Sequence, residues 1–373
     1  MQLVINTFGA SLKRKGDRFV VRAGANHLAV SAHKVRSILV TTAVHLSSDA
    51  IVLAVAHNID IVFLEKSGGL VARIWPPRMG LTAAIRRRQL EVAEGPEGLA
   101  LAREWVSTKL RNQVEFLEEL RERRPSLRNG FDGPIGTIRS SLAQLDGIEG
   151  TLNVQRGRIL GLEGSAGRAY FVCLGGLVPE AYRFEGRSRQ PARDGANAML
   201  NYAFGVLYSL VGRACICAGL DPFLGFLHTN NYNKPSLVLD LIEPFRILAE
   251  RAAVLLFTGR RVRSEFFEAV PGGVALSKAG RAEFLPYYHE RLDRPVRYPI
   301  QSKPGKYRRI KRRETIAHEA HALANRLLGR NDLPRVVETR RLWDEAKDAA
   351  PSDDVLDVPE EEGDSPPEEP EPC

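Results

Sequence analysis

The chain has 373 residues, of which 44% are hydrophobic, 26% charged and 7% aromatic, a globular composition with room for two or three domains. The sequence has no run of about 18 apolar residues and no signal-like start, so we expect no transmembrane helix and a cytoplasmic protein. Four cysteines without a CxxC pair exclude a disulfide scaffold and a zinc knuckle.

The charge is unevenly distributed along the chain. Residues 351–373 hold ten acidic residues, six prolines and no Lys or Arg, which predicts a disordered tail. The other residues, with 53 basic and 35 acidic side chains, have a net charge of +18. A body this basic attracts polyanions, and nucleic acid is the partner we expect; solubility through net charge is the alternative.

The first 76 residues are predicted to be β-rich. Gly16-Asp17 separates two alternating runs, which is typical of a tight hairpin, and Ser47 or Ser48 is placed to cap one short helix. The predicted strands are 3–7, 11–15, 18–22, 27–32, 35–42, 59–66 and 70–75. We expect a small sheet domain covered by that helix.

After Pro76-Pro77 the hydrophobic period changes to that of helices. Helices are predicted over 81–124 with a break at 94–98, and over 134–171, 194–218, 236–260 and 314–329. The fold class is therefore α+β, with a small N-terminal β-rich domain followed by a larger all-α domain. The predicted boundaries are 1–78 for the β-rich domain, 79–330 for the helical domain, and 331–373 for an accessory helix and the disordered acidic tail.

Two segments place a chemically useful side chain beside small or apolar neighbours. Glu163 lies in LGLEGSAGRAYF, where Gly, Ser and Ala would let a second backbone or a substrate come close. His228 follows the apolar run of GLDPFLGFLH and begins a polar loop. Taken alone, close helix packing explains the first segment better than a functional carboxylate does, and a structural histidine explains the second better than a ligand does.

A third segment, PSLVLDLIEPFRILAE, carries two acids and an arginine on one helical face. Asp240, Glu243 and Arg246 recur at three-residue steps, which fits an exposed ion-pair ladder; in so apolar a helix it also fits buried carboxylates that need a cation. Two carboxylates and one imidazole from three segments suit Mg²⁺ or Mn²⁺ better than zinc. With a basic body, the chemistry expected of such a metal is phosphodiester transfer.

The runs LEGSAGRAYF, FEGRSRQPARDGANAMLNYAFGVLY, GLDPFLGFLH and PSLVLDLIEPFR resemble, in order and approximate spacing, the Cas-one family of CRISPR-associated adaptation integrases. The resemblance covers roughly residues 1–330. It implies an N-terminal β domain for dimerisation, a helical catalytic domain, and one divalent metal held by a glutamate, a histidine and an acid. By position these resemble Glu163, His228 and Glu243, with Asp240 and Arg246 as supporting residues.

The resemblance leaves two choices among the acids. Many members have aspartate as the third ligand, and Asp240 is a second acid on the face that carries Glu243. Glu149, in LDGIEG, repeats the local pattern of the first ligand, but it lacks the small residues and the aromatic pair that follow Glu163. Glu163 is therefore the preferred first ligand.

Basic side chains are expected to contact DNA, and for any one of them a solvated surface position is the alternative. The run KPGKYRRIKRR (303–313) is predicted to be an exposed polyanion-binding loop. Lys109 and Arg111 are further candidates on the helix that follows the break. The main expected contacts are Arg86, Arg87, Arg168, Arg187, Arg189, Lys306, Arg308 and Arg309.

The resemblance implies a metal-dependent DNA endonuclease and integrase that inserts short foreign DNA fragments into a CRISPR array, in antiviral defence. It also implies a homodimer that works with a dimer of a small adaptation partner subunit, on DNA and without a membrane. A structure-selective repair nuclease with the same ligands is one alternative. A non-catalytic nucleic-acid scaffold is another.

Overall fold

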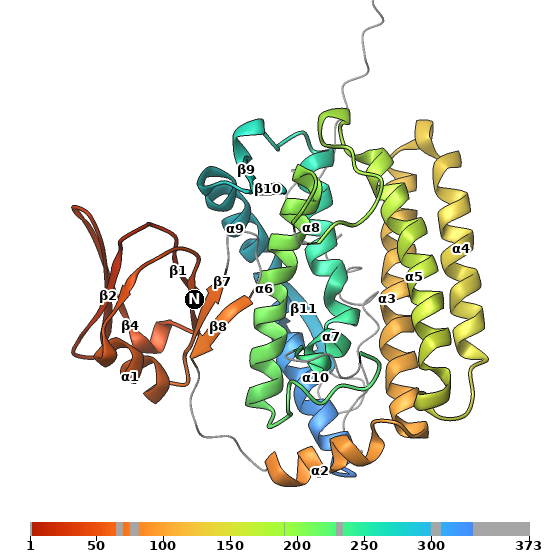
Figure 1. Cartoon of the computed structure of the whole chain (residues 1–373), viewed down its shortest axis with the longest axis horizontal. Helices are drawn as coiled ribbons and strands as arrows, with labels where there is room; N and C mark the ends of the chain where they lie inside the picture. The colour runs from red at the N-terminus through yellow and green to blue at the C-terminus, as the bar shows by residue number, and fades with distance from the viewer. Residues whose placement is uncertain are drawn as a thin grey trace, which may run out of the picture.

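The computed structural model describes residues 2–64, 70–74, 82–189, 191–228, 234–299 and 307–330. Two four-stranded sheets form the N-terminal part (Figure 1). The first has the order β1 (Gln2–Ile5), β5 (Ser37–Val40), β7 (Asp60–Leu64) and β8 (Leu70–Ile74), parallel except for β8. The second has the order β4 (Asn26–Ser31), β3 (Arg18–Ala23), β2 (Ser11–Lys15) and β6 (His45–Leu46). The chain thus forms two sheets where the sequence suggested one.

Local signals in this part are confirmed. Strands β2 and β3 pair as a hairpin around the two-residue loop, in which Gly16 takes a φ of +59°, a conformation that favours glycine. Helix α1 (Ser48–Ala56) begins after Ser47, whose hydroxyl accepts a hydrogen bond from the backbone N–H of Ala50. Apolar side chains from both sheets and α1 form one core, which includes Leu12, Phe19, Ile38, Leu53 and Ile61.

The rest of the described chain is mainly helical, and Figure 1 shows α3, α4 and α5 side by side at the end away from the sheets. The helices are α2 (Thr82–Val92), α3 (Pro96–Glu122), α4 (Asn129–Asp146), α5 (Leu152–Leu177), α6 (Gly195–Cys217), α7 (Ser236–Leu241), α8 (Arg246–Thr258), α9 (Lys278–Asp293) and α10 (Arg312–Leu327). Short 3-10 turns are η1 (Ala32–Lys34), η2 (Pro125–Leu127), η3 (Glu180–Tyr182), η4 (Glu243–Phe245) and η5 (Ser264–Phe266). The fold class expected from the sequence is confirmed.

Several elements depart from the expected helices. The helix predicted over 134–171 is two helices, α4 and α5, because the chain turns between them at Gly150, where φ is +105°. The sequence analysis also missed two antiparallel hairpins and α9. The hairpins are β9 (Phe267–Val270) with β10 (Gly273–Leu276), and β11 (Pro295–Pro299) with β12 (Tyr307–Lys311). The predicted accessory helix and tail at 331–373 lie outside the described residues.

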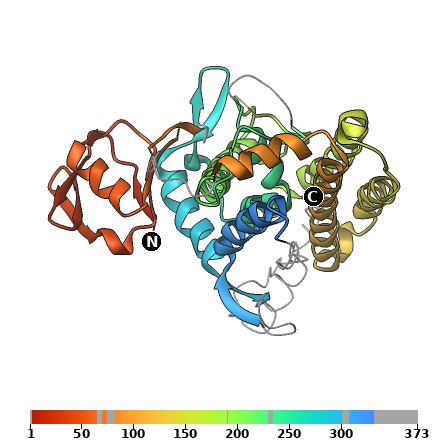
Figure 2. The same ribbon diagram turned by 90° about the horizontal axis from the view of Figure 1, so that it is seen from below.

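Helix α6 runs through the middle of the helical part, between the sheets and α8 (Figures 1 and 2). Among the described helices it is the one long and apolar enough to cross a membrane by length and composition, whereas the sequence analysis found no run of apolar residues that long. Two thirds of its apolar window (67%) is buried inside the protein, as in the core helix of a globular domain.

Buried charges join the sheets to the helices. Asp60, at the start of β7, lies 3.5 Å from Arg73 Nε of β8 and 3.3 Å from Arg213 Nη1 of α6. Arg73 also donates to Ser209 Oγ of α6 at 3.1 Å. Burial raises the pKa of Asp60, while the two arginines oppose that shift. A buried carboxylate with two cationic partners fixes how the two parts meet, and we call this group the Asp60 joint.

Candidate functional site

Three distant segments meet at one buried ammonium group. Lys109, on α3, has only 6% of its side chain exposed. Its Nζ contacts Glu163 Oε1 of α5 and lies 2.7 Å from Glu243 Oε2 of η4. Burial opposes the charged form, but the two carboxylates outweigh it and raise the pKa of Lys109. Two residues predicted to hold a metal therefore share a cation supplied by the chain itself.

Glu243 is held by a second cation from its own segment. The predicted helix over 236–260 is interrupted at Glu243-Pro244, where η4 separates α7 from α8. Arg246 Nε donates to Glu243 Oε1 at 2.8 Å. Burial alone would raise the pKa of the Glu243 carboxyl, but Arg246 and Lys109 outweigh burial and lower it to about 2. Glu243 is therefore a carboxylate at neutral pH.

His228 is oriented by Asp240. Its Nδ1 lies 2.7 Å from Asp240 Oδ1, which leaves the Nε2 nitrogen as its free ligand atom. Burial favours the neutral ring, but the hydrogen bond and the charge of Asp240 outweigh it, so the pKa of His228 is raised. The charge of Glu243 contributes to the same shift, so the His228 ring lies near enough to be influenced by that carboxylate.

The structure distinguishes the two acids of this face. Both oxygens of the fully buried Asp240 are engaged, because Oδ2 accepts the backbone N–H groups of Phe226 and Leu227 while Oδ1 accepts from the backbone and ring of His228. Glu243 instead points to Lys109. Asp240 is therefore surrounded by N–H donors of the His228 segment, whereas Glu243 is engaged by two cations, Lys109 and Arg246.

The donor set fits a hard divalent cation with one nitrogen ligand, namely two carboxylates and an imidazole. Among the described residues, the ligand atoms of Glu163, His228 and Glu243 do not all come within 4.8 Å of one another, and Lys109 lies between the two acids. The ammonium has the position and sign of charge that a metal would take. For a metal ion to bind between Glu163 and Glu243, the Lys109 ammonium would have to break its contact with at least one of the two carboxylates.

The alternative first ligand does not belong to this site. Glu149 is exposed in the turn between α4 and α5, and its backbone carbonyl accepts a hydrogen bond from Gln155. The carboxylate of Glu163 on α5, by contrast, contacts the buried ammonium of Lys109 on α3.

The predicted DNA-contacting arginines have different surroundings. Arg187 is half-buried between the aromatic rings of Phe171 and Phe204 and donates to Asn201 Oδ1 at 2.7 Å. Its burial lowers its pKa to about 10. The guanidinium thus holds the segment before α6 to that helix. Arg87, Arg168 and Arg189 are exposed, and Arg86 pairs with Asp221 at 3.2 Å.

The predicted basic loop at 303–313 is partly wrong. Residues from Tyr307 to Lys311 are strand β12, with Arg308 and Arg309 exposed, and Lys306 lies outside the described residues. Arg312 starts α10 and is buried at 4% exposure, although the charge of this run predicted full exposure. Its Nη1 donates to the Arg291 carbonyl at 3.2 Å, and burial lowers its pKa to about 9.

The sequence analysis missed the role of Lys109, which it treated as a phosphate contact. The available signal was its position three residues after Val106 and one before Leu110, apolar residues of α3 that are both buried. A lysine at a buried position needs anionic partners. Glu250 of α8, buried near Tyr170 of α5, was also missed.

Comparisons with known proteins agree with this architecture. A family model described as CRISPR associated protein Cas1 matches residues 3–290. A protein from Archaeoglobus fulgidus, named CRISPR-associated endonuclease Cas1 1, is 33% identical over 311 residues, covering 80% of this chain and 90% of its own length. A protein of the same name from Thermus thermophilus is 32% identical over 334 residues, covering 88% of this chain and 97% of its own.

Two solved structures have the same fold. A casposase bound to integration product has a TM-score of 0.79 at 23% identity, covering 92% of this chain and 94% of its own. A CAS1 protein from Thermotoga maritima has a TM-score of 0.72 at 23% identity, covering 88% and 97%. The predicted family, fold class and endonuclease function are confirmed. The chain belongs to the CRISPR-associated protein Cas1 family, whose curated relatives are endonucleases.

Proposed function

We propose that this chain is a metal-dependent DNA integrase of CRISPR adaptation that acts in the cytoplasm, with Glu163, His228 and Glu243 as its metal ligands. The observation that carries the proposal is the convergence of Glu163 and Glu243 on Lys109, with His228 aligned beside them by Asp240. The reaction is transesterification. The 3′-hydroxyl of a short DNA fragment attacks a phosphodiester phosphorus of the repeat, a new phosphodiester bond forms, and the bond to the repeat's own 3′-oxygen breaks, so that this oxygen leaves and the proton of the attacking hydroxyl is released.

A divalent ion held by these three residues, Mg²⁺ or Mn²⁺, would stabilise the negative charge on the attacking or leaving oxygen of the phosphodiester. Asp240 keeps the proton on His228 Nδ1, so that Nε2 stays available as a ligand atom. Arg246 holds Glu243 in its ionised form, and Lys109 adds positive charge where a phosphate would bind. The side chains bind and orient, and no protein nucleophile is required.

The basic surface would hold the DNA. Arg168 on α5 and Arg189 before α6 are exposed, and so are Arg308 and Arg309 on β12. Phosphate contacts release counterions, so DNA affinity is expected to fall steeply as salt rises. Flat affinity between low and moderate salt would contradict this assignment.

A homodimer formed through the β-rich part, working with a dimer of a small partner subunit, completes the proposal. Its support is the family and one chain of a solved Cas6-RT-Cas1–Cas2 complex, which matches 91% of this chain with a TM-score of 0.75 at 18% identity, while 36% of that chain's own length is covered.

The test is strand joining in vitro, with a supercoiled plasmid and a fragment that has a free 3′-hydroxyl, in Mg²⁺ or Mn²⁺. His228→Ala and Glu163→Gln should abolish joining while DNA binding persists, and Glu149→Gln is the matched control because Glu149 is exposed. Full activity of either site variant would defeat the ligand assignment. Cutting without joining would favour a repair nuclease, and calorimetry that detects no Mn²⁺ binding would favour a scaffold.

A further inference from the structure

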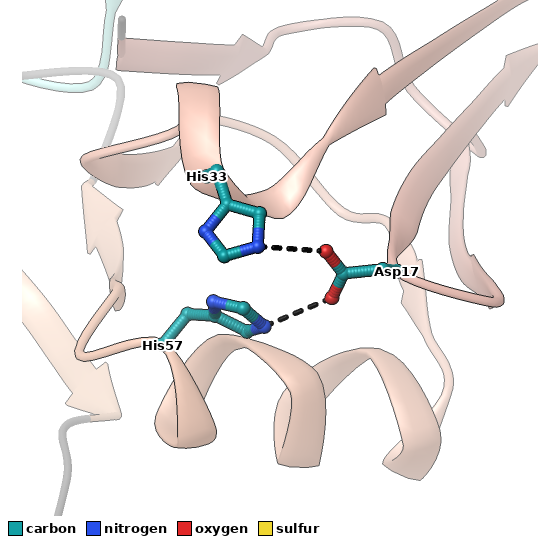
Figure 3. Close-up of side chains that lie close together, drawn as sticks. All are labelled: Asp17, His33 and His57. Atoms are coloured by element: carbon teal, nitrogen blue, oxygen red, sulfur yellow. Dashed lines mark hydrogen bonds and ion pairs between the residues drawn. The ribbon is translucent and has the colours of Figure 1, made fainter.

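A cluster in the β-rich part, far along the chain from the proposed ligands, brings two histidines and an aspartate together. Figure 3 shows the three side chains pointing toward one another. His57 Nε2 lies 2.9 Å from Asp17 Oδ1, and His33 Nε2 lies 3.1 Å from Asp17 Oδ2. Among the described residues this is the one group of three potential ligands whose atoms all lie within 4.8 Å of one another.

Each of the three side chains is carried by a well-defined backbone. Asp17 is in the tight loop of the β2–β3 hairpin, and its carbonyl accepts the N–H of Ala32 at 3.0 Å, which ties this loop to η1 and so to His33. His57 is the C-cap of α1, and its N–H is bonded to the last turn of that helix. The cluster therefore rests on three fixed segments, which favours a preorganised site.

Two imidazoles direct Nε2 at the same carboxylate. The ring centroids of His33 and His57 are 4.7 Å apart, and the potential ligand atoms of the three side chains all lie within 4.8 Å of one another. A single cation between them would be bound through a lone pair on each imidazole and through the carboxylate. We propose that Asp17, His33 and His57 form a second metal site, specific for a late first-row divalent cation, and that the cation is Zn²⁺.

The spacing supports this chemistry. Zinc bonds of about 2.0–2.2 Å in tetrahedral geometry separate two ligand atoms by roughly 3.3 Å. The observed separations of 2.9 and 3.1 Å join the two imidazoles to different oxygens of Asp17, and the three potential ligand atoms lie within 4.8 Å of one another, so side-chain rotation must bring them onto one cation. Three protein ligands leave a fourth position for water. Imidazole ligands select against Mg²⁺, so this site and the proposed catalytic site would prefer different ions.

The site would tie the hairpin loop, η1 and α1 together. His33 has 73% of its side chain exposed and Asp17 has 51%, so a cation from solvent can reach the cluster without unfolding. Binding to the folded state alone raises stability by mass action, so Zn²⁺ should raise the unfolding temperature of the protein.

The experiment uses the full chain without an affinity tag, stripped of metal and held in excess Mg²⁺. Calorimetric titration with ZnCl₂ should show one site that persists in His228→Ala. His33→Gln should lower its affinity more than the roughly 10–100-fold that loss of an outer-shell partner costs, because a direct ligand is removed. The matched control is His27→Gln, an exposed histidine on β4 of the same sheet, which should bind Zn²⁺ as the parent does.

Two results would overturn the proposal. One is unchanged Zn²⁺ affinity in both His33→Gln and His57→Gln. The other is loss of all Zn²⁺ binding in His228→Ala, which would put the ion at the proposed catalytic site. X-ray absorption of the zinc-loaded protein should show two imidazole ligands; their absence would mean an adventitious ion only. Metal-free His33→Gln should unfold at the parent temperature, because its side chain is exposed, so weaker binding would not reflect misfolding.

Discussion

Substitution of Lys109 tests the site most directly, because one change can remove the positive charge while most of the buried side chain stays in place. Lys109→Met keeps much of the buried stem and removes the ammonium that Glu163 and Glu243 share. Without it, Glu243 retains Arg246, while Glu163 loses a buried partner. We expect the metal-free protein to lose stability and the affinity for a divalent cation to rise.

The expected loss in the free energy of unfolding follows from the burial of the ion pair between Lys109 and Glu163. Removing one partner of a buried ion pair costs about 3–5 kcal/mol, because the other charge stays buried and unpaired. The side chain of Glu163 is 26% exposed, so water screens part of that charge and the lower end, about 3 kcal/mol, is expected. A divalent ion at 100 times its Kd contributes about 2.7 kcal/mol, so saturation should restore most of the loss.

The assay is denaturant unfolding with and without Mn²⁺, paired with calorimetric titration of the ion. Arg111→Met is the matched control, because Arg111 is an exposed basic residue on the same helix and should change stability by less than about 0.5 kcal/mol. Metal-free Lys109→Met as stable as the parent, or stabilised by Mn²⁺ no more than the parent, would refute the view that this lysine substitutes for the ion.

Three further outcomes are expected. Asp240→Asn should weaken Mn²⁺ binding by about 10–100-fold in calorimetry, because the ring of His228 loses its orienting carboxylate; unchanged affinity would mean that the ring is held by other contacts. Because the pKa of His228 is raised, its charged pair with Asp240 stabilises the metal-free fold fully below about pH 6.5, and this contribution is lost as pH rises through the raised value. Mn²⁺ affinity should rise over the same interval, and a titration midpoint at or below the usual value would contradict this. Gly175→Ala should destabilise the protein by about 1–3 kcal/mol in thermal unfolding, because a Cβ there would collide with the carbonyl of Phe184. Gly176→Ala, which meets open space, should be neutral or stabilising, and equal effects of the two would refute the packing argument.

Local patterns accounted for much of the fold. The hairpin around Gly16, the helix cap at Ser47 and the helical period after Pro76-Pro77 depend on neighbours within a few residues, and the sequence contains all of that information. The hairpin of β11 and β12 was missed because its two strands pair across an intervening segment that does not have the composition of a tight turn. The burial of Arg312 was missed for a similar reason, because its partners lie on other elements.

The site was only partly predictable. Its three proposed ligands came from spacing together with a family resemblance, and the structure brings Glu163 and Glu243 to one point. Asp240 is engaged by the backbone N–H groups around His228 and Glu243 by two cations, and these tertiary contacts appear in no one-dimensional pattern. The bridging position of Lys109 depends on how α3 and α5 pack, so sequence alone could not supply it.

The Asp60 joint bears on the distance between the reaction centres of two associated copies of the chain. If copies associate through their sheets, as we propose, a hinge at this junction would let the two reaction centres drift apart. A buried carboxylate paired with Arg73 and Arg213 opposes such bending. The separation between the two proposed reaction centres would then stay constant, and with it the spacing of the DNA positions on which they act.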